Sequence, residues 1–289
     1  MSDAQVAVVG GGPAGLSAAL AAARAGAGVV LFDENPSFGG QLRYRIADLP
    51  PLEFPPRLAE KLIAEARNAG VELRPQTVVW GLFPGGVLAV SEGIDSYQIR
   101  ADQIVLATGS TDLPFTFPGG SLPGVMTARG LQILLHVQRV LPARHFAVVG
   151  AGPEAVEVRR DIELADGRVV VQVDPECDGS SLAAEGEDAV QAMDIAGDRH
   201  EVDAVVIAIG RQPDNELAQM VACEAGFSAE LGGFVPLRDA NLRTSVPGIL
   251  VAGDAAGICD AGMAIAEGRF AGLSAAAALG LVSDGTLDA

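Results

Sequence analysis

The chain of 289 residues is 49% hydrophobic and contains 36 glycines, which is typical of an α/β protein with tight turns and, at this length, of two domains. Its formal net charge of −18 argues against nucleic-acid binding, because phosphate backbones need a positive protein surface. No apolar run is long enough to cross a membrane, and the predicted first strand begins too early for a signal peptide, so we expect a cytoplasmic protein without membrane insertion.

The N-terminal segment has the pattern of a βαβ unit. Residues 6–9 predict a buried parallel strand, and residues 13–25 predict a helix of mostly small side chains. Residues 29–32 predict a second strand, which is followed directly by Asp33. Strand, helix, second strand and terminal acid occur in the order that a dinucleotide-binding unit requires.

Three glycines occupy the G-x-G-x-x-G positions of this unit. Gly10 allows the tight turn, Gly12 lets the backbone approach a pyrophosphate, and Gly15 lets helix and strand pack closely. The first N–H groups of the helix would face the anion. Asp33 lies where a carboxylate can accept hydrogen bonds from an adenosine ribose.

The segment that follows predicts further elements of the same domain. A proline-rich stretch over residues 48–57 predicts irregular structure before a helix over residues 58–69. Short strands and glycine turns then predict an antiparallel meander, followed by a buried strand that ends at Gly109. The predicted strands cover residues 71–73, 77–82, 87–91, 96–100 and 104–108.

The glycine turn recurs in the middle of the chain. Gly150 and Gly152 follow a predicted strand, and the next strand ends at Asp174, so we predict a second nucleotide-binding module inserted into the first. The proline-rich stretch 113–123 would be the crossing between the domains. The late strand that ends at Gly253-Asp254, with a helix over residues 262–279, would return to the first domain.

We therefore predict a Rossmann-like α/β fold with two dinucleotide-binding domains, the first of which is discontinuous. That domain would comprise residues 1–112 and 241–289, and the inserted domain residues 113–240. Only 60 residues separate Gly150 from Gly210, which is short for a complete dinucleotide fold.

Two interpretations of the inserted module remain open. In the first, Asp174 accepts from an adenosine ribose, and Gly150 and Gly152 hold an adenine nucleotide such as NAD, ATP or AMP. In the second, the module is a vestigial fold kept for packing. Glu154 and Glu157 favour the second slightly, because they place negative charge where a phosphate would bind.

The cysteine and histidine patterns argue against several kinds of site. Cys177, Cys223 and Cys259 stand singly, which argues against a redox dithiol, an iron–sulfur cluster and a zinc site within this chain. The histidines have no patterned partners. We therefore expect no metal site.

The overall layout resembles that of FAD-dependent, pyridine nucleotide-disulfide oxidoreductase-like flavoproteins. A narrower resemblance is carried by segments similar to the FAD-containing α-type subunits of opine oxidase, hydroxyproline and proline dehydrogenases, sarcosine oxidase and hydrogen cyanide synthase. These segments are residues 32–41, 113–119, 122–128, 257–258 and 267–269.

The resemblance implies FAD as cofactor and assigns roles to individual residues. Gly39, Gly40 and Gln41 would lie beside the pyrophosphate and the flavin edge, and Asp254 would accept a hydrogen bond from a ribityl hydroxyl. Either Val78 or Val79 would offer backbone hydrogen bonds to adenine; Thr108 and Gly109 would cover the dinucleotide. Met263 and Ala264 would open a helix whose positive end faces the flavin. The full predicted set is Gly10, Gly12, Pro13, Ala14, Gly15, Asp33, Glu34, Gly39, Gly40, Gln41, Val79, Thr108, Gly109, Gly253, Asp254, Met263 and Ala264.

The leading hypothesis is an FAD-dependent oxidoreductase that acts as one subunit of an amine, imino-acid or opine dehydrogenase or oxidase. The flavin would mediate the chemistry, with no catalytic acid–base pair from this chain. The resemblance implies a second flavoprotein subunit of the amine-oxidase type. Members of the family commonly carry a C-terminal cysteine-rich iron–sulfur domain, which we expect this chain to lack. The electrons would therefore pass to oxygen, to a direct acceptor or to an iron–sulfur subunit.

Two alternatives remain open. One is a stand-alone NAD(P)H-dependent flavin reductase of the thioredoxin-reductase-like class without a redox dithiol. The other is a non-catalytic nucleotide-binding scaffold subunit. The sequence does not specify the amine, the electron acceptor or the subunit stoichiometry.

Overall fold

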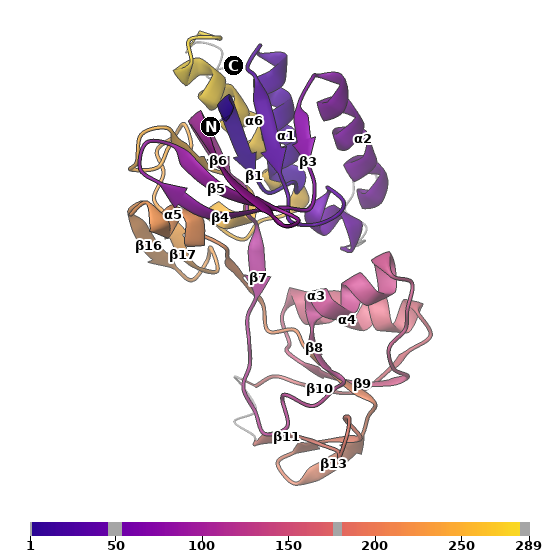
Figure 1. The fold of residues 1–289 in the computed structure, drawn as a ribbon. Helices are drawn as coiled ribbons and strands as arrows, with labels where there is room; N and C mark the ends of the chain where they lie inside the picture. Colours follow the sequence, from indigo (N-terminus) through magenta and orange to yellow (C-terminus); the bar gives the residue numbers. More distant parts are fainter. Residues whose placement is uncertain (1, 46–53, 176–180, 284–289) are drawn as a thin grey trace. The chain divides into compact units, whose positions relative to one another are not determined.

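The computed structural model describes residues 2–45, 54–175 and 181–283 (Figure 1). The chain divides into two compact units: Met1–Leu42, Asp48–Thr111 and Gln212–Ala289 form the first, and Arg43–Ala47 and Asp112–Arg211 the second. Cys177 and most of the proline-rich segment 48–57 lie outside the described residues.

The first unit is built on a seven-stranded mixed sheet with the order β3-β2-β1-β6-β5-β4, in which β18 also pairs with β6. β1, β2, β3 and β18 run parallel to β6, whereas β4 and β5 form an antiparallel meander with it. The strands are β1 (Ser2–Val9), β2 (Val29–Phe32), β3 (Glu72–Arg74), β4 (Thr77–Phe83), β5 (Val87–Glu92), β6 (Asp95–Leu106) and β18 (Ile249–Val251). The sequence predicts two strands, 96–100 and 104–108, where the structure has the single long strand β6.

Each face of this sheet carries its own hydrophobic core, because successive residues of a strand point to opposite faces. Val6 and Val8 lie in a core with side chains of the helices α1 (Pro13–Arg24), α2 (Pro55–Asn68) and α6 (Ala261–Ala278). Ala7 and Val9 lie in a second core with side chains of β4, β5 and α5 (Glu216–Met220). Figure 1 shows the three long helices together on one side of the sheet.

The first and last long helices of this unit contact each other through their backbones. A Cβ on Gly268 would lie 2.0 Å from the carbonyl oxygen of Ala14, and one on Gly272 would lie 2.2 Å from that of Ala18. Only glycine fits at these two positions of α6 while the helices keep this distance.

The return to the first unit occurs earlier in the chain than residue 241. Residues from Gln212 onward belong to this unit, because Leu217 and Ala218 of α5 are buried in its core. A small hairpin follows, formed by β16 (Ala225–Ser228) and β17 (Gly233–Pro236). None of these elements has a strong periodic pattern, which is why the sequence places the boundary later.

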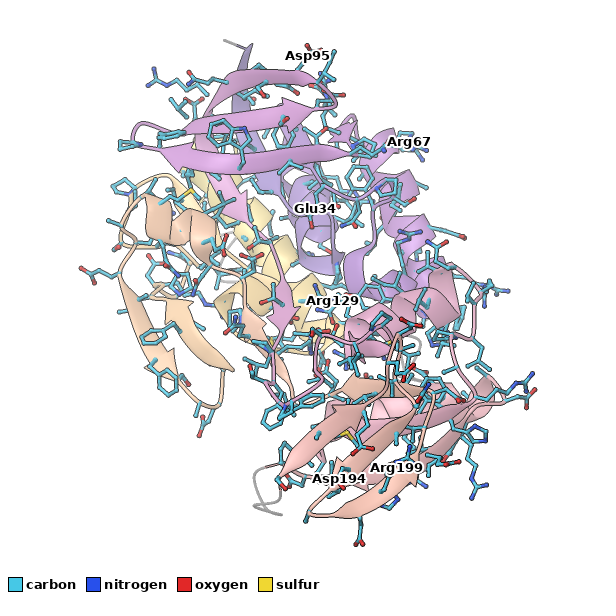
Figure 2. The ribbon with its side chains drawn as sticks, turned by 60° about the horizontal axis from the view of Figure 1, so that its bottom comes forward. Glu34, Arg67, Asp95, Arg129, Asp194 and Arg199 are labelled. Atoms are coloured by element: carbon cyan, nitrogen blue, oxygen red, sulfur yellow. The ribbon has the colours of Figure 1, made fainter. Side chains whose placement is uncertain are left out.

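The second unit contains a four-stranded parallel sheet with the order β10-β9-β14-β8 and a separate antiparallel meander, β11-β12-β13. The helices α3 and α4 pack on one face of the parallel sheet, and the meander packs on the other. Figure 2 labels Asp194 and Arg199, which face each other in register on β12 and β13. The elements are β8 (Val125–Thr127), α3 (Ala128–Gln132), β9 (His145–Val149), α4 (Pro153–Leu164), β10 (Arg168–Val173), β11 (Leu182–Glu185), β12 (Ala192–Ile195), β13 (Asp198–Glu201) and β14 (Ala204–Ile207).

The second unit repeats the plan of the first with one part shortened. β9, α4 and β10 correspond to β1, α1 and β2, and the meander β11-β12-β13 corresponds to β4-β5-β6. Among the described residues of this unit, nothing corresponds to the helix α2 and the strand β3. The inserted module is therefore a reduced Rossmann-type domain, as predicted.

A two-stranded ribbon contains two of the chain connections between the units, because β7 (Ser110–Asp112) pairs with β15 (Arg211–Pro213). The sequence predicts the crossing in the stretch 113–123, but Phe117 of that stretch is buried in the core of the second unit. In the part of the chain that the structure covers, no helix combines the length and apolar character needed to span a bilayer.

Candidate functional site

The first glycine turn is tightly packed on one side and open on the other. A Cβ on Gly10 would lie 2.2 Å from the carbonyl oxygen of Ala107, whereas a Cβ on Gly12 would meet no atom within 4 Å. Gly12 is the N-cap of α1, and no side chain of the described residues caps that helix. Pro13 supplies no N–H, so the N–H groups of Ala14 and Gly15 face outward at the positive end of the helix.

Two further predicted segments adjoin this turn. Gly39 donates its N–H to the carbonyl oxygen of Gly11 at 2.8 Å, and a Cβ on Gly40 would lie 2.9 Å from the Cα of Gly12. From the other end of the chain, a Cβ on Gly253 would lie 2.7 Å from the Cβ of Ala14. Two segments that are distant in the chain thus adjoin the glycine turn and the start of α1.

Asp33 closes the turn on the side of β2. Its buried carboxylate accepts a hydrogen bond from Gly11 N at 2.6 Å through Oδ2 and one from Asn35 N at 2.8 Å through Oδ1. The neighbouring Glu34, labelled in Figure 2, is exposed. The acid predicted to receive a ribose is therefore fixed directly against the glycine turn.

Asp254 is the centre of a hydrogen-bond network. It lies in the 3₁₀ segment Gly253–Ala256, and its Oδ2 accepts from Gln41 Nε2 at 2.6 Å and from Ser110 Oγ at 2.8 Å. Its Oδ1 accepts from Cys259 N at 3.1 Å. The sequence predicts Gln41 and Asp254 as cofactor-binding residues but does not predict Ser110, whose only signal is its place directly after Gly109.

Cys259 is a protonated thiol in this network. Burial, together with the nearby carboxylates of Asp254 and Glu267, raises the pKa of Cys259 to about 12. Since the thiolate is the reactive form of cysteine, this side chain is a poor nucleophile at neutral pH. The environment argues against a redox role for Cys259.

The ion pair between Glu267 and Arg238 fixes the turn that precedes Asp254. Glu267 of α6 accepts a hydrogen bond from Gly253 N at 2.9 Å and from Arg238 Nη2 at 2.6 Å. Gly253 has φ +71°, a conformation that favours glycine. Glu267 was part of the family resemblance, but its role in fixing this turn was not predicted.

The remaining predicted residues occupy defined positions. Thr108 donates its hydroxyl to the carbonyl oxygen of Asp214 at 2.6 Å, which fixes the end of β6 beside Gly109. Val79 lies on β4 next to a bulge in its pairing with β5. Met263 and Ala264 lie in the first turns of α6, where Asp260 caps the helix by accepting from Met263 N at 2.8 Å. Because that cap occupies the Met263 N–H, the uncapped N–H groups at this helix start belong to residues before Met263.

The second glycine turn has the same backbone but a different charge environment. A Cβ on Gly150 would lie 2.0 Å from the carbonyl oxygen of Ala208, and a Cβ on Gly152 would meet no atom within 4 Å. Glu154 stands in the first turn of α4, with Oε1 3.6 Å from Arg211 Nε. Burial raises the pKa of Glu154 despite the attraction of Arg211. Asp174 follows β10, as predicted.

Metal binding finds no support here: within residues 2–45, 54–175 and 181–283, the side chains of His, Cys, Asp and Glu form no group of three that could hold an ion.

The sequence profile of the pyridine nucleotide-disulphide oxidoreductase family matches residues 4–177 and 158–277. The chain belongs to this family. The family binds FAD and NAD(P), and the chain is thus a nucleotide-binding flavoprotein of the oxidoreductase class.

Curated proteins similar to this chain include subunits of oxidases. An opine oxidase subunit of Rhizobium meliloti (strain 1021) is 29% identical over 94% of this chain and 71% of its own length. The corresponding opine oxidase subunit of Agrobacterium tumefaciens (strain Ach5) is 30% identical over 96% of this chain and 66% of its own length. The alpha subunit of sarcosine oxidase from Corynebacterium sp. (strain P-1) is 30% identical over 95% of this chain, but the chain spans only 32% of it.

Solved structures show the same family fold. The crystal structure of L-proline dehydrogenase from P. horikoshii superposes with a TM-score of 0.87 at 26% identity, covering 96% of this chain and 56% of that chain. T. acidophilum thioredoxin reductase superposes with a TM-score of 0.74 at 19% identity, covering 96% of this chain and 99% of that chain. The predicted fold class and the predicted family resemblance are both confirmed.

The first turn fits the FAD of the pyridine nucleotide-disulphide oxidoreductase family. It offers open space over Gly12, outward N–H groups at the start of α1, and a carboxylate at the end of β2. The second turn offers the same backbone, but the carboxylate of Glu154 stands at the helix start where a phosphate would need N–H donors. The first turn is therefore better suited to bind a dinucleotide than the second.

Proposed function

We propose that this chain is the FAD-binding subunit of a heteromeric oxidoreductase that oxidises C–N bonds in an amine, imino acid or opine. The observation that carries the proposal is the FAD-type cradle around α1, where Gly12, Gly40 and Gly253 meet and Gln41 is bonded to Asp254. The names of the relatives, opine oxidase, sarcosine oxidase and L-proline dehydrogenase, support the substrate class.

Different residues of the cradle would bind different parts of FAD. The N–H groups of Ala14 and Gly15 would bind the pyrophosphate, and Asp33 would accept from the adenosine ribose. Asp254 would accept from a ribityl hydroxyl, while Gln41 and Ser110 hold its carboxylate in place. When bound, the flavin supplies the redox chemistry by accepting a hydride equivalent and passing electrons on.

A partner subunit is part of the proposal. The relatives are named as subunits, and the chain spans about two thirds of the opine oxidase subunits and about a third of the sarcosine oxidase subunit. We propose that a second flavoprotein subunit of the amine-oxidase type contributes the site where the amine is oxidised. An iron–sulfur subunit is proposed as an electron acceptor.

A stand-alone NAD(P)H-dependent flavin reductase is the second candidate. The glycine turn at Gly150 and Gly152 favours it, because its backbone matches that of the first turn. The charge of Glu154 counts against it. The remaining alternative is a scaffold subunit that binds FAD without catalysis. A flavin that no donor reduces, alone or with a partner, would distinguish this alternative from the two enzymes.

The test begins with the purified chain, which should be yellow and release FAD on denaturation. Sarcosine, L-proline, hydroxyproline and an opine are then added anaerobically to the chain alone and to the chain co-expressed with a flavoprotein subunit of the amine-oxidase type. Bleaching of flavin absorbance by one of these donors only in the co-expressed complex supports the proposal. Bleaching of the chain alone by NADH supports the reductase, and a protein without FAD after supplementation contradicts both.

A further inference from the structure

The glycine turns at Gly10–Gly12 and Gly150–Gly152 share a sequence pattern and a backbone conformation. Each is a Gly-x-Gly-Pro sequence that leads into a 12-residue helix. The N-cap glycines have nearly the same backbone, with φ −75° and ψ −171° at Gly12 and φ −73° and ψ −175° at Gly152. The residue after the proline differs: it is Ala14 in α1 and Glu154 in α4.

Glu154 lies at the edge of the sheet where a ligand of this fold would bind. Gly150 follows β9, and Arg211 follows Gly210 beyond β14, so Glu154 and Arg211 meet beside the carboxyl ends of two adjacent parallel strands. Open parallel sheets hold their nucleotides at this edge. The side chains of Glu154 and Arg211 are only 10% and 9% exposed, so the pair fills buried space there.

The other arginines around this pair also face carboxylates. The side chain of Arg129 on α3, labelled in Figure 2, lies 3.6 Å from that of Asp112, which also accepts from Arg129 N at 2.9 Å. Arg45 donates from Nε to Glu157 Oε2 at 3.0 Å, one helical turn beyond Glu154. A dinucleotide pyrophosphate entering here would meet cations that are already paired with carboxylates.

We propose that the Glu154–Arg211 pair takes the place of the nucleotide phosphates, so that the second module binds neither NAD(P)H nor another adenine nucleotide. The electrons for the FAD of the first module then come from a donor other than a nicotinamide. This consequence rests on the proposed function, whereas the binding statement concerns the second module alone.

The test measures nucleotide binding to the FAD-loaded protein. ADP and NADH are titrated by calorimetry at neutral pH into the wild type, Glu154→Ala and Glu163→Ala. Glu163 is a matched control, because it is an exposed acid near the other end of α4 whose carboxylate pairs with Arg159 on the same helix. We expect no saturable binding up to about 1 mM for the wild type and the control.

Glu154→Ala gives the second turn the same residue that follows the proline in the first, and removes the carboxylate that faces Arg211. We expect this variant to bind ADP at least about tenfold more tightly than the wild type. Glu154→Gln removes the charge but keeps the side-chain volume. Tighter ADP binding by this variant as well would show that the charge of Glu154, rather than its size, prevents binding. Circular dichroism checks folding, and Glu154→Gln carries the test if the alanine variant does not fold.

Saturable binding of ADP or NADH to the wild type would overturn the proposal. So would folded Glu154 variants that gain no affinity, because another feature would then close the module. The FAD content of each sample is recorded separately. Loss of FAD from the wild type contradicts the proposed function. Because ADP could then bind the empty first cradle, the second module is in that case read from the difference in affinity between the wild type and the Glu154 variants, since Glu154 lies in the second unit.

Discussion

Gln41 donates a hydrogen bond from Nε2 to Oδ2 of Asp254 at 2.6 Å, although the two residues are 213 positions apart. Gln41 follows the loop after β2, and Asp254 follows β18, so the bond joins the early and late segments of the discontinuous first unit. Ser110 donates to the same oxygen from the end of β6. One carboxylate oxygen thus links three segments of the proposed FAD site.

Ser110→Ala should weaken FAD binding. The substitution removes the 2.8 Å hydrogen bond to Asp254, and a hydrogen bond to a charged group contributes about 1.5–3 kcal/mol. We expect the Kd for FAD to rise about tenfold or more, measured by flavin fluorescence during titration of the apoprotein. Ser91→Ala is the control, since Ser91 Oγ bonds only the exposed turn at Asp95. An unchanged Kd for Ser110→Ala would show that Asp254 does not depend on this hydroxyl.

Cys259 should make stability fall at alkaline pH. Its pKa is raised from 9.0 to about 12 in the folded state, so the folded thiol keeps its proton at a pH where the unfolded thiol has lost it. The stability from this group is complete below about pH 9 and declines as pH rises toward 12.

Urea unfolding at a series of pH values measures this effect. The difference in free energy of unfolding between wild type and Cys259→Ala should shrink from pH 8.5 to about pH 10.5. Iodoacetamide should also modify Cys259 only slowly in the native protein at pH 8. Rapid native alkylation at Cys259 would contradict the buried, protonated thiol.

Gly268→Ala should destabilise the protein. A methyl group there would lie 2.0 Å from the backbone of Ala14, so α6 must move away from α1, and overpacking of this kind costs about 1–3 kcal/mol or more. Gly28→Ala is a matched control, because its Cβ would meet only Gln5 Oε1, at 3.5 Å. Thermal unfolding should show a clear drop in Tm for the first variant alone. Equal Tm values would mean that the two helices separate easily.

Glu267→Ala should destabilise the turn at Gly253. It leaves Arg238 without the carboxylate of a largely buried ion pair and removes the acceptor of Gly253 N, at a cost of about 2 kcal/mol. Glu65→Ala removes the exposed partner of Arg24 and should cost less than about 1 kcal/mol. Chemical denaturation compares the two variants. Similar losses would show that burial of Glu267 adds nothing.

Prediction from sequence is most accurate for elements whose contacts are between residues close together in the chain. The unit β1–α1–β2 follows from a strand, a glycine turn and a terminal Asp33 that are close in the chain, so propensity and spacing suffice. The join between strands 96–100 and 104–108 was missed because polar Asp102 and Gln103 interrupt the apolar pattern. In the structure, pairing with β1 carries β6 straight through them.

Long-range features were harder to predict. Ser110 has no motif of its own, and its role appears only when Asp254 is brought to it by the fold. Similarly, α5 is a single short helix whose membership of the first unit depends on burying Leu217, so sequence reasoning set the boundary at 241. The Glu154–Arg211 pair required knowing that β9 and β14 are neighbours.

The discontinuity of the first unit has a consequence for synthesis on the ribosome. The second unit is nearly contiguous, and its sheet is complete once β14 has emerged. The first unit lacks β18 and α6 until the whole second unit has been synthesised, so α1 has no partner helix over Ala14 and Ala18 during that time. Because domains fold as units, we expect the second unit to fold before the first, although its synthesis begins later. The proposed FAD site, which needs β18 and α6, would form after it.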